Sequence, residues 1–181
     1  MALRVSVADG IEATDVVAFG VDAEGSPESP QMGDVDAGFL RTTGFDPTKV
    51  GSTQWVSVAG RPALAVALGK GGPDDRRTAA AAAVRAATHV PRLVTTLHGT
   101  DPGPVVEGAV LGHYRYRPAD EGKALLEEVV LVGPLDGHAV ANAQVRAAAA
   151  VRARDWVNRP PRDLRPRRFA DEAAEAGAAP G

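Results

Sequence analysis

The sequence predicts an α/β fold in which a mixed β-sheet carries helices on its faces. Strand-type segments come first, and strands then alternate with helical segments, an order typical of this class. Residues 93–97 form a continuous run of apolar and β-branched residues, and residues 128–132 are expected as a second strand of the same kind, buried on both faces. After this domain, the adjacent Pro160 and Pro161 predict a break in the backbone and then a short final helix.

The first half of the chain is expected to supply four strands and one short helix. Alternating or β-branched apolar residues mark the strands, which are expected at residues 3–7, 15–21, 54–58 and 63–68. The last two flank Gly60, Arg61 and Pro62, a turn that predicts a hairpin. The short helix is expected at residues 36–43 and ends near Gly44.

The second half is expected to alternate helices with the two apolar strands. Alanine content and apolar periodicity predict the helices, which are expected at residues 74–89, 104–114 and 137–157. Asp74 and Asp75 favour the start of the first of these, because carboxylates complement the helix dipole. The final helix is expected at residues 167–176, with Pro166 near its first turn and Gly177 just after its end.

The composition excludes several classes of protein. The 181 residues suffice for one domain with a sizeable core plus a tail, and we expect the domain at residues 1–157 and the tail at 158–181. A net charge of −3 argues against a general nucleic-acid binder. The absence of cysteine excludes disulfides and thiolate metal sites. The N-terminus lacks signal-peptide features and no run is long enough to span a membrane, so we expect a soluble, cytoplasmic protein.

Few residues are arranged as a catalytic or metal site. His89, His98, His113 and His138 show no metal-binding spacing, and surface or edge positions are expected for them. No nucleophile motif surrounds Ser6, Ser26, Ser29, Ser52 or Ser57. The carboxylate pairs fall at element ends, where helix-start charges and solvated loops explain them: Asp74/Asp75, Asp120/Glu121 and Glu127/Glu128. We therefore assign no catalytic, cofactor-binding or metal-binding residue.

Two segments nevertheless contain residues that could bind an anion such as phosphate. The glycine-rich residues 69–72 follow a strand and precede a helix, which suits a phosphate cradle, but an ordinary strand-to-helix turn is the better interpretation. Seven arginines fall within residues 152–168. They could contact phosphates, although a solvated linker, or one that pairs with acids of a partner domain, fits the proline-broken backbone better.

Three segments together resemble the leucyl (cytosol) aminopeptidase family. Residues 153–166 are similar to its A-R-x-L-x-N-x-P-P-N-x-L-x-P linker, residues 107–116 to E-G-x-x-L-G-x-Y-x-F, and residues 66–70 to V-x-L-G-K. Phe169 and Ala170 match the helix that follows the linker. Trp156 and Arg162 depart from the pattern, where Leu and Asn are usual.

The resemblance implies a non-catalytic N-terminal domain with a macro-domain-like sheet. Family members are metal-dependent leucyl aminopeptidases, usually hexamers, that release N-terminal amino acids from peptides with two divalent metals, Zn or Mn. Their metal ligands lie in K-G-x-x-F-D-[ST]-G-G and N-T-D-A-E-G-R-L, neither of which occurs here. The expected partner is therefore a C-terminal catalytic domain absent from this chain, and the expected role is assembly and access to the active site.

Two alternatives stay open from the residues alone. A stand-alone macro-like module could bind ADP-ribose-like nucleotides, for which residues 69–72 are the only candidate cradle. The arginine linker could instead contact nucleic acid, which the acidic balance of the chain disfavours.

Overall fold

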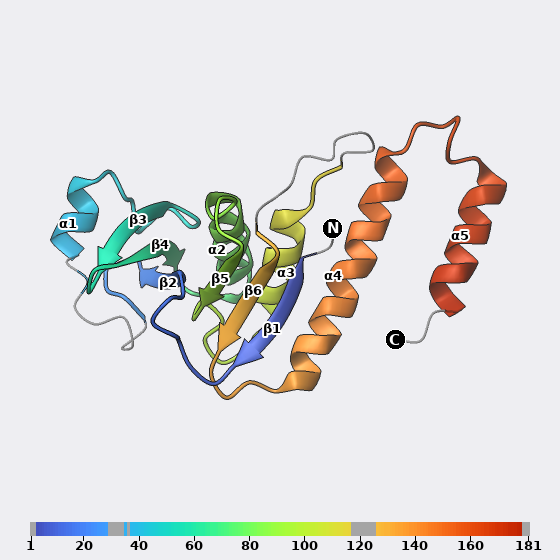
Figure 1. Ribbon diagram of the computed structural model, residues 1–181. Helices are drawn as coiled ribbons and strands as arrows, with labels where there is room; N and C mark the ends of the chain where they lie inside the picture. Colours follow the sequence, from blue (N-terminus) through green and yellow to red (C-terminus); the bar gives the residue numbers. More distant parts are fainter. Residues whose placement is uncertain (1–2, 29–34, 36, 117–125, 179–181) are drawn as a thin grey trace.

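The computed structural model describes residues 3–28, 35, 37–116 and 126–178. They form one six-stranded sheet, in the order β1-β6-β5-β2-β4-β3, with helices packed beside it (Figure 1). The strands are β1 (Arg4–Ala8), β2 (Val17–Asp22), β3 (Thr53–Val58), β4 (Arg61–Gly69), β5 (Arg92–Thr95) and β6 (Glu128–Val132). The helices are α1 (Ala37–Thr42), α2 (Pro73–Ala86), α3 (Gly103–His113), α4 (Gly137–Asn158) and α5 (Pro166–Ala178).

The sheet is mixed, as predicted. Strands β1, β6, β5, β2 and β4 run parallel, and only β3 pairs antiparallel, with β4. The hairpin between β3 and β4 is confirmed. The turn was predicted at residues 60–62, but it lies at residues 59–60, because β4 already begins at Arg61. Ala59 and Gly60 form it, with φ of 50° and 77°. Pro62 already lies in β4, where a missing N–H is tolerated near the start of a strand.

Each face of the sheet has its own apolar core, which explains the continuous apolar runs. In β4, Leu64, Val66 and Leu68 pack in the cluster that contains α2 and α3, whereas Ala63 and Ala65 belong to the cluster on the other face. Besides these β4 alanines, the second cluster includes side chains from α1, the following loop and four further strands: Leu40, Phe45, Phe19, Val58, Val94 and Val130. Side chains that alternate across a strand therefore meet apolar partners on both sides.

Helices α2 and α3 approach so closely that there is no room for a side chain at Gly108 or Gly112. A Cβ on Gly108 would clash with the carbonyl oxygen of Arg77, and one on Gly112 would lie 2.6 Å from the Cα of Ala81. Helix α4 packs on α3 in turn, so that α3 lies between α2 and α4 (Figure 1). Glycines four residues apart on α3 thus set the spacing of this helical layer.

A row of alternating charges crosses the sheet at the start of its parallel strands. Asp15, whose side chain is 3% exposed, pairs with Arg92 at 2.8 Å. Glu128 pairs with Arg4 at 3.1 Å and with Arg92 at 3.7 Å, and it also accepts a hydrogen bond from the Ser6 hydroxyl. Arg4 and Arg92 lie opposite Glu128 in the strand register. A slip by one residue would separate these charges, so the row supports the register of four neighbouring segments.

Glutamine side chains cap an outward-facing carbonyl on each outer strand. On β1, the Val5 carbonyl oxygen accepts a 2.7 Å hydrogen bond from Gln144 of α4. On β3, the Trp55 carbonyl oxygen accepts one of 3.0 Å from the neighbouring Gln54. These caps satisfy backbone groups for which the sheet has no further strand.

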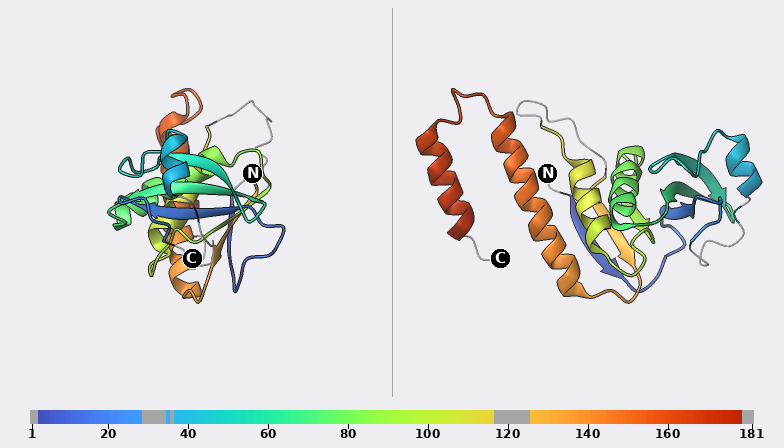
Figure 2. Two further views of the ribbon diagram at one scale, coloured as in Figure 1. Left: turned by 90° about the vertical axis from the view of Figure 1, so that its left-hand side faces the viewer. Right: turned by 180° about the vertical axis from the view of Figure 1, so that it is seen from behind.

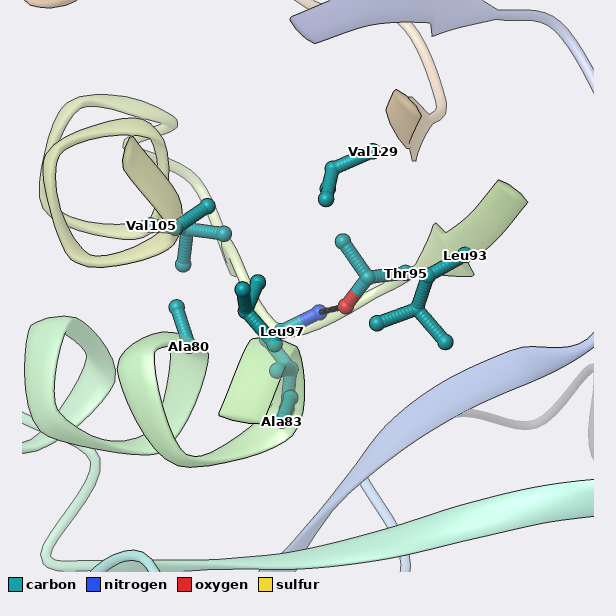
Figure 3. A pocket seen from close by; sticks show the side chains of 9 residues that line it. Ala80, Ala83, Leu93, Thr95, Leu97, Val105 and Val129 are labelled. Carbon is teal, nitrogen blue, oxygen red and sulfur yellow. Dashed lines mark hydrogen bonds between the residues drawn. The ribbon is translucent and has the colours of Figure 1, made fainter. Parts of the chain in front are cut away.

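A small apolar cavity of about 10 Å³ lies between the sheet and helices α2 and α3 (Figure 3). Its lining residues are Ala80, Ala83, Val84, Leu93, Thr95, Leu97, Val105, Ala109 and Val129. The Thr95 hydroxyl already donates to the Ala18 carbonyl and accepts from the Leu97 N–H. With no free polar partner on its wall, the cavity is too apolar to hold water.

Extending one lining residue should stabilise the fold. Val129→Ile adds one methylene group toward the cavity and is expected to raise the free energy of unfolding by about 0.5–1 kcal/mol. The matched control is Val94→Ile, another buried strand valine, which packs in the opposite core cluster. There the extra carbon overpacks, at a cost of about 1–3 kcal/mol. Urea denaturation measures both, and equal effects of the two substitutions would contradict the assignment of the cavity.

The C-terminal helices begin within one residue of the prediction, but α5 continues through Gly177 to Ala178, so its predicted end at residue 176 is wrong. Helix α4 begins at Gly137, after Asp136 caps its first turn by accepting from the His138 N–H at 2.9 Å. It ends at Asn158, one residue beyond the predicted end and before the two prolines. Helix α5 then lies beside α4, away from the sheet, and none of its residues is buried (Figure 2). In the described part of the chain, no helix has both the length and the apolar character that crossing a membrane requires.

Candidate functional site

The glycine-rich loop at residues 69–72 is occupied by its own hydrogen bonds. The Lys70 N–H donates to the Asp75 carboxylate at 3.2 Å, and the Gly71 N–H donates to the Leu68 carbonyl at 2.8 Å. Amides that would have to face a phosphate are therefore already paired, and a carboxylate lies among them. The geometry supports the interpretation as a strand-to-helix turn.

Arg76, one turn into α2, joins the loops that follow three parallel strands. Its Nε donates to the Gly71 carbonyl at 2.9 Å and its Nη1 to the Leu97 carbonyl at 2.5 Å. Its Nη2 donates to both carboxylate oxygens of Glu28, at 3.1 and 2.9 Å. The side chain is 15% exposed. Sequence reasoning missed this residue, because nothing in the local pattern separates it from the other arginines of the chain.

Arg76→Ala should therefore destabilise the carboxyl edge of the sheet. It leaves the Gly71 and Leu97 carbonyls without their donor, and the expected loss in the free energy of unfolding is about 2 kcal/mol. Arg85→Ala is the matched control, since Arg85 is an exposed arginine of the same helix with no partner among the described residues. Denaturation with urea compares the two variants. Arg76 would not be the junction of these loops if both variants unfolded at the same urea concentration.

The four histidines lie apart. His89 packs its ring on Trp55, with 4.9 Å between centroids, and His138 lies in the first turn of α4. His113 faces the Leu126 carbonyl at 3.1 Å, and burial lowers the pKa of its imidazole. The described residues contain no group of three or more His, Asp or Glu side chains that could hold a metal ion. The geometry thus offers no metal centre within these ranges.

Surface or edge positions were expected for all four histidines, and for His98 this expectation is wrong. It is 7% exposed, and its ring nitrogens face the carbonyl oxygens of Gly99, at 2.8 Å, and Val132, at 3.0 Å. The ring thus connects the loop after β5 with the end of β6. A neutral imidazole carries a single N–H, and either of these two carbonyl oxygens can accept from it, so the buried ring has a partner for its donor.

The serines and carboxylates singled out by sequence serve local structure. Ser6 bonds Glu128, and Asp74 pairs with Arg77 at the start of α2. In the hydrogen bonds of the described residues, no serine side chain meets a histidine ring. Ser29, Asp120 and Glu121 lie outside the described residues.

The aminopeptidase-like segment at residues 107–116 consists of helix-packing residues. Glu107 accepts from Arg77 of α2 at 3.1 Å and from Arg146 of α4 at 2.9 Å, so it joins the helices on either side of α3. Gly108 and Gly112 allow the close approach of α2 described above. The segment therefore joins α2, α3 and α4.

The same segment contacts the linker segment at its end. The Tyr114 hydroxyl donates to Asp155 at 2.7 Å and accepts from the Asn158 amide at 3.2 Å. The Arg154 guanidinium lies 5.8 Å from the centre of the Tyr114 ring. Burial and the nearby Asp155 carboxylate raise the pKa of the Tyr114 hydroxyl. Two segments singled out separately in the sequence are thus joined in space.

Among the arginines of residues 152–168, Arg159 at the start of the linker and Arg168 on α5 share one carboxylate partner. Both donate to Glu172 of α5. Hydrogen bonds from Trp156 and Arg159, with a further one from Arg168, lower the pKa of Glu172 from 4.5 to about 2. The Arg162 side chain is 83% exposed. The cluster around Glu172 is the second site that sequence reasoning missed, because its members are separated by the proline linker.

Comparison with known proteins gives this arrangement a context. No family model matches the chain. Curated relatives named probable cytosol aminopeptidase are 31–40% identical, and the one from Streptomyces coelicolor is 31% identical over 221 residues, covering 97% of this chain and 43% of its own. The solved bottromycin maturation enzyme BotP is 35% identical, with a TM-score of 0.72 over 90% of this chain and 37% of that protein. Tomato leucine aminopeptidase, 17% identical, shares the fold with a TM-score of 0.76, covering 96% of this chain and 41% of its own.

These matches define the chain as an α/β domain related to aminopeptidases. The resemblance to the leucyl (cytosol) aminopeptidase family is confirmed, and it is to the N-terminal region of these proteins. The chain spans 22–43% of the length of the curated relatives that it matches. Nothing found here supports the nucleotide-binding or nucleic-acid-binding alternative.

Proposed function

We propose that this chain is the non-catalytic N-terminal domain of a leucyl-aminopeptidase-type metallo-exopeptidase. The observation that carries the proposal is the alignment of up to 97% of this chain with less than half of a cytosol aminopeptidase. The residues described here provide packing, capping and ion pairs. We propose that residues 1–157 form the domain and that residues 158–181 lead toward a catalytic domain.

The chemistry of the whole enzyme would come from outside this chain. A solved structure of BotP contains Mn. In such an enzyme a pair of divalent metals polarises the scissile carbonyl and activates water. The described residues offer no ligand set for such ions, so no step of the hydrolysis is assigned to them.

A peptidase assay tests the inert character of this chain. The purified chain is incubated with leucine p-nitroanilide and Mn²⁺ or Zn²⁺, beside a full-length cytosol aminopeptidase as positive control. We expect no release of p-nitroaniline above the metal-only blank. Metal-dependent turnover by this chain would overturn the proposal that catalysis lies elsewhere.

We further propose that the domain serves assembly and access to the active site in a cytoplasmic hexamer. Support comes from the placement of α4 and α5, which extend from α3 away from the sheet (Figure 1). Deleting the homologous domain from the Streptomyces coelicolor relative tests this role. Light scattering should then report a smaller assembly, and an unchanged mass together with unchanged turnover would contradict the proposal.

A further inference from the structure

Helix α5 is tied back to α4 across the proline linker by one carboxylate. Glu172 accepts hydrogen bonds from the indole N–H of Trp156 at 2.9 Å, from Arg159 at 2.7 and 2.9 Å, and from Arg168 at 3.0 Å. Trp156 lies on α4, Arg159 opens the linker, and Arg168 lies on α5. A single carboxylate therefore connects all three parts.

Aromatic packing supports the same contact. The rings of Trp156 and Phe169 meet edge to face, with 5.0 Å between centroids and 78° between planes. This geometry is a favourable one for aromatic pairs. Because Phe169 lies one turn before Glu172 on α5, the ring contact and the hydrogen bonds act on the same side of the helix.

The linker itself is also ordered by internal hydrogen bonds. The Asp163 and Leu164 N–H groups donate to the Pro160 carbonyl, at 2.8 and 3.1 Å. Arg168 also donates to the Asp163 carbonyl at 3.1 Å. The adjacent prolines restrict the remaining backbone freedom.

The first helix of this pair is anchored to the domain. Asp155 and Asn158, in the last turn of α4, hold the Tyr114 hydroxyl at the end of α3. A chain of contacts thus runs from the helical layer through the end of α4 to α5.

We propose that Trp156, Arg159, Arg168 and Glu172 form a latch that fixes α5 at one angle to α4. Helix α4, the linker and α5 then move as a single rigid arm on the domain. The latch therefore sets the orientation of the C-terminal end of α5 relative to the domain. It does not depend on the proposed function, because the angle can be measured in this chain whatever its activity.

The charge state of Glu172 favours a closed latch at neutral pH. Its pKa of about 2, against an ordinary value of 4.5, means that the docked helix favours the carboxylate. The latch therefore contributes fully above the ordinary pKa and weakens as pH falls from there toward 2. The charged groups that face Glu172 are Arg159 and Arg168.

Distance measurement between spin labels tests the latch. The chain has no cysteine, so cysteines introduced at the exposed Ala148 of α4 and Ala174 of α5 can be labelled selectively. Pulsed electron paramagnetic resonance on the protein that carries only these two labelled cysteines should give one narrow distance distribution. Glu172→Gln and Trp156→Phe, which removes the indole N–H but keeps a ring, should each lose the single narrow peak.

The matched control is Glu175→Gln. Glu175 is an exposed glutamate on the same helix with no partner among the described residues, and its replacement should leave the peak unchanged. A broad distribution in the unsubstituted protein would overturn the rigid arm. A narrow distribution that survives both latch substitutions would overturn the assignment to these side chains.

Discussion

Replacing Gly108 by alanine is expected to lower the free energy of unfolding by about 3 kcal/mol or more. The added Cβ would clash with the Arg77 carbonyl oxygen and lie 2.9 Å from its carbonyl carbon, so backbone rather than a flexible side chain would have to move. The two helices would separate, and the apolar contacts between α2 and α3 would be loosened along their length. Urea denaturation followed by circular dichroism measures the loss.

The control for this substitution is Gly137→Ala, at the first residue of α4. A Cβ there would meet nothing within 4 Å. Its effect should stay within about 0.5 kcal/mol. If the two alanine variants were equally stable, the helical layer would not depend on the close approach at Gly108.

Reversing the charge of Arg92 is the second substitution for which we expect a large effect. Arg92→Glu places a carboxylate between Asp15 and Glu128 and leaves the buried Asp15 without its cation. The Asp15 side chain is buried, but Arg92 is 37% exposed, so water reaches one side of the pair and the expected loss is about 2–3 kcal/mol. Thermal and urea unfolding should both show the loss at neutral pH.

Arg4→Glu is the control for Arg92→Glu, since it makes the same charge reversal beside the same Glu128. The Arg4 side chain is 71% exposed, so water screens the new repulsion. The expected loss is below about 1 kcal/mol. A loss at Arg4 as large as that at Arg92 would show that the burial of Asp15 is not the source of the effect.

Local patterns were sufficient to predict the order of the elements. The alanine-rich and apolar segments place α2, α4 and β6 within a few residues of where the structure has them, because these patterns depend on neighbours in the sequence. The hairpin turn was misplaced because Pro62 was taken as a turn residue, whereas the backbone turns at Ala59 and Gly60. Both residues have a positive φ, and the sequence around an alanine such as Ala59 does not indicate this conformation.

The contacts of the candidate sites could be predicted much less well. Arg76 meets Glu28, Gly71 and Leu97, which come from three separate segments, so only the assembled sheet brings them together. The burial of His98 likewise depends on the Val132 carbonyl, 34 residues away. The three segments were sufficient to predict the family, but they gave no physical role for the residues in them. The structure supplies one such role, because Gly108 allows α2 and α3 to pack closely.

The glutamine caps on the outer strands have a consequence for behaviour at high protein concentration. An uncapped edge strand offers a row of free backbone groups to which a strand of a second molecule can add. Gln144 bonds one carbonyl in the middle of β1, and Gln54 bonds one in the middle of β3. An incoming strand would have to share or displace a side-chain amide at that carbonyl, which opposes growth of the sheet from copy to copy. Purified chain should therefore stay dispersed when concentrated, and β3, where the cap comes from the strand itself, is the edge at which self-association would begin.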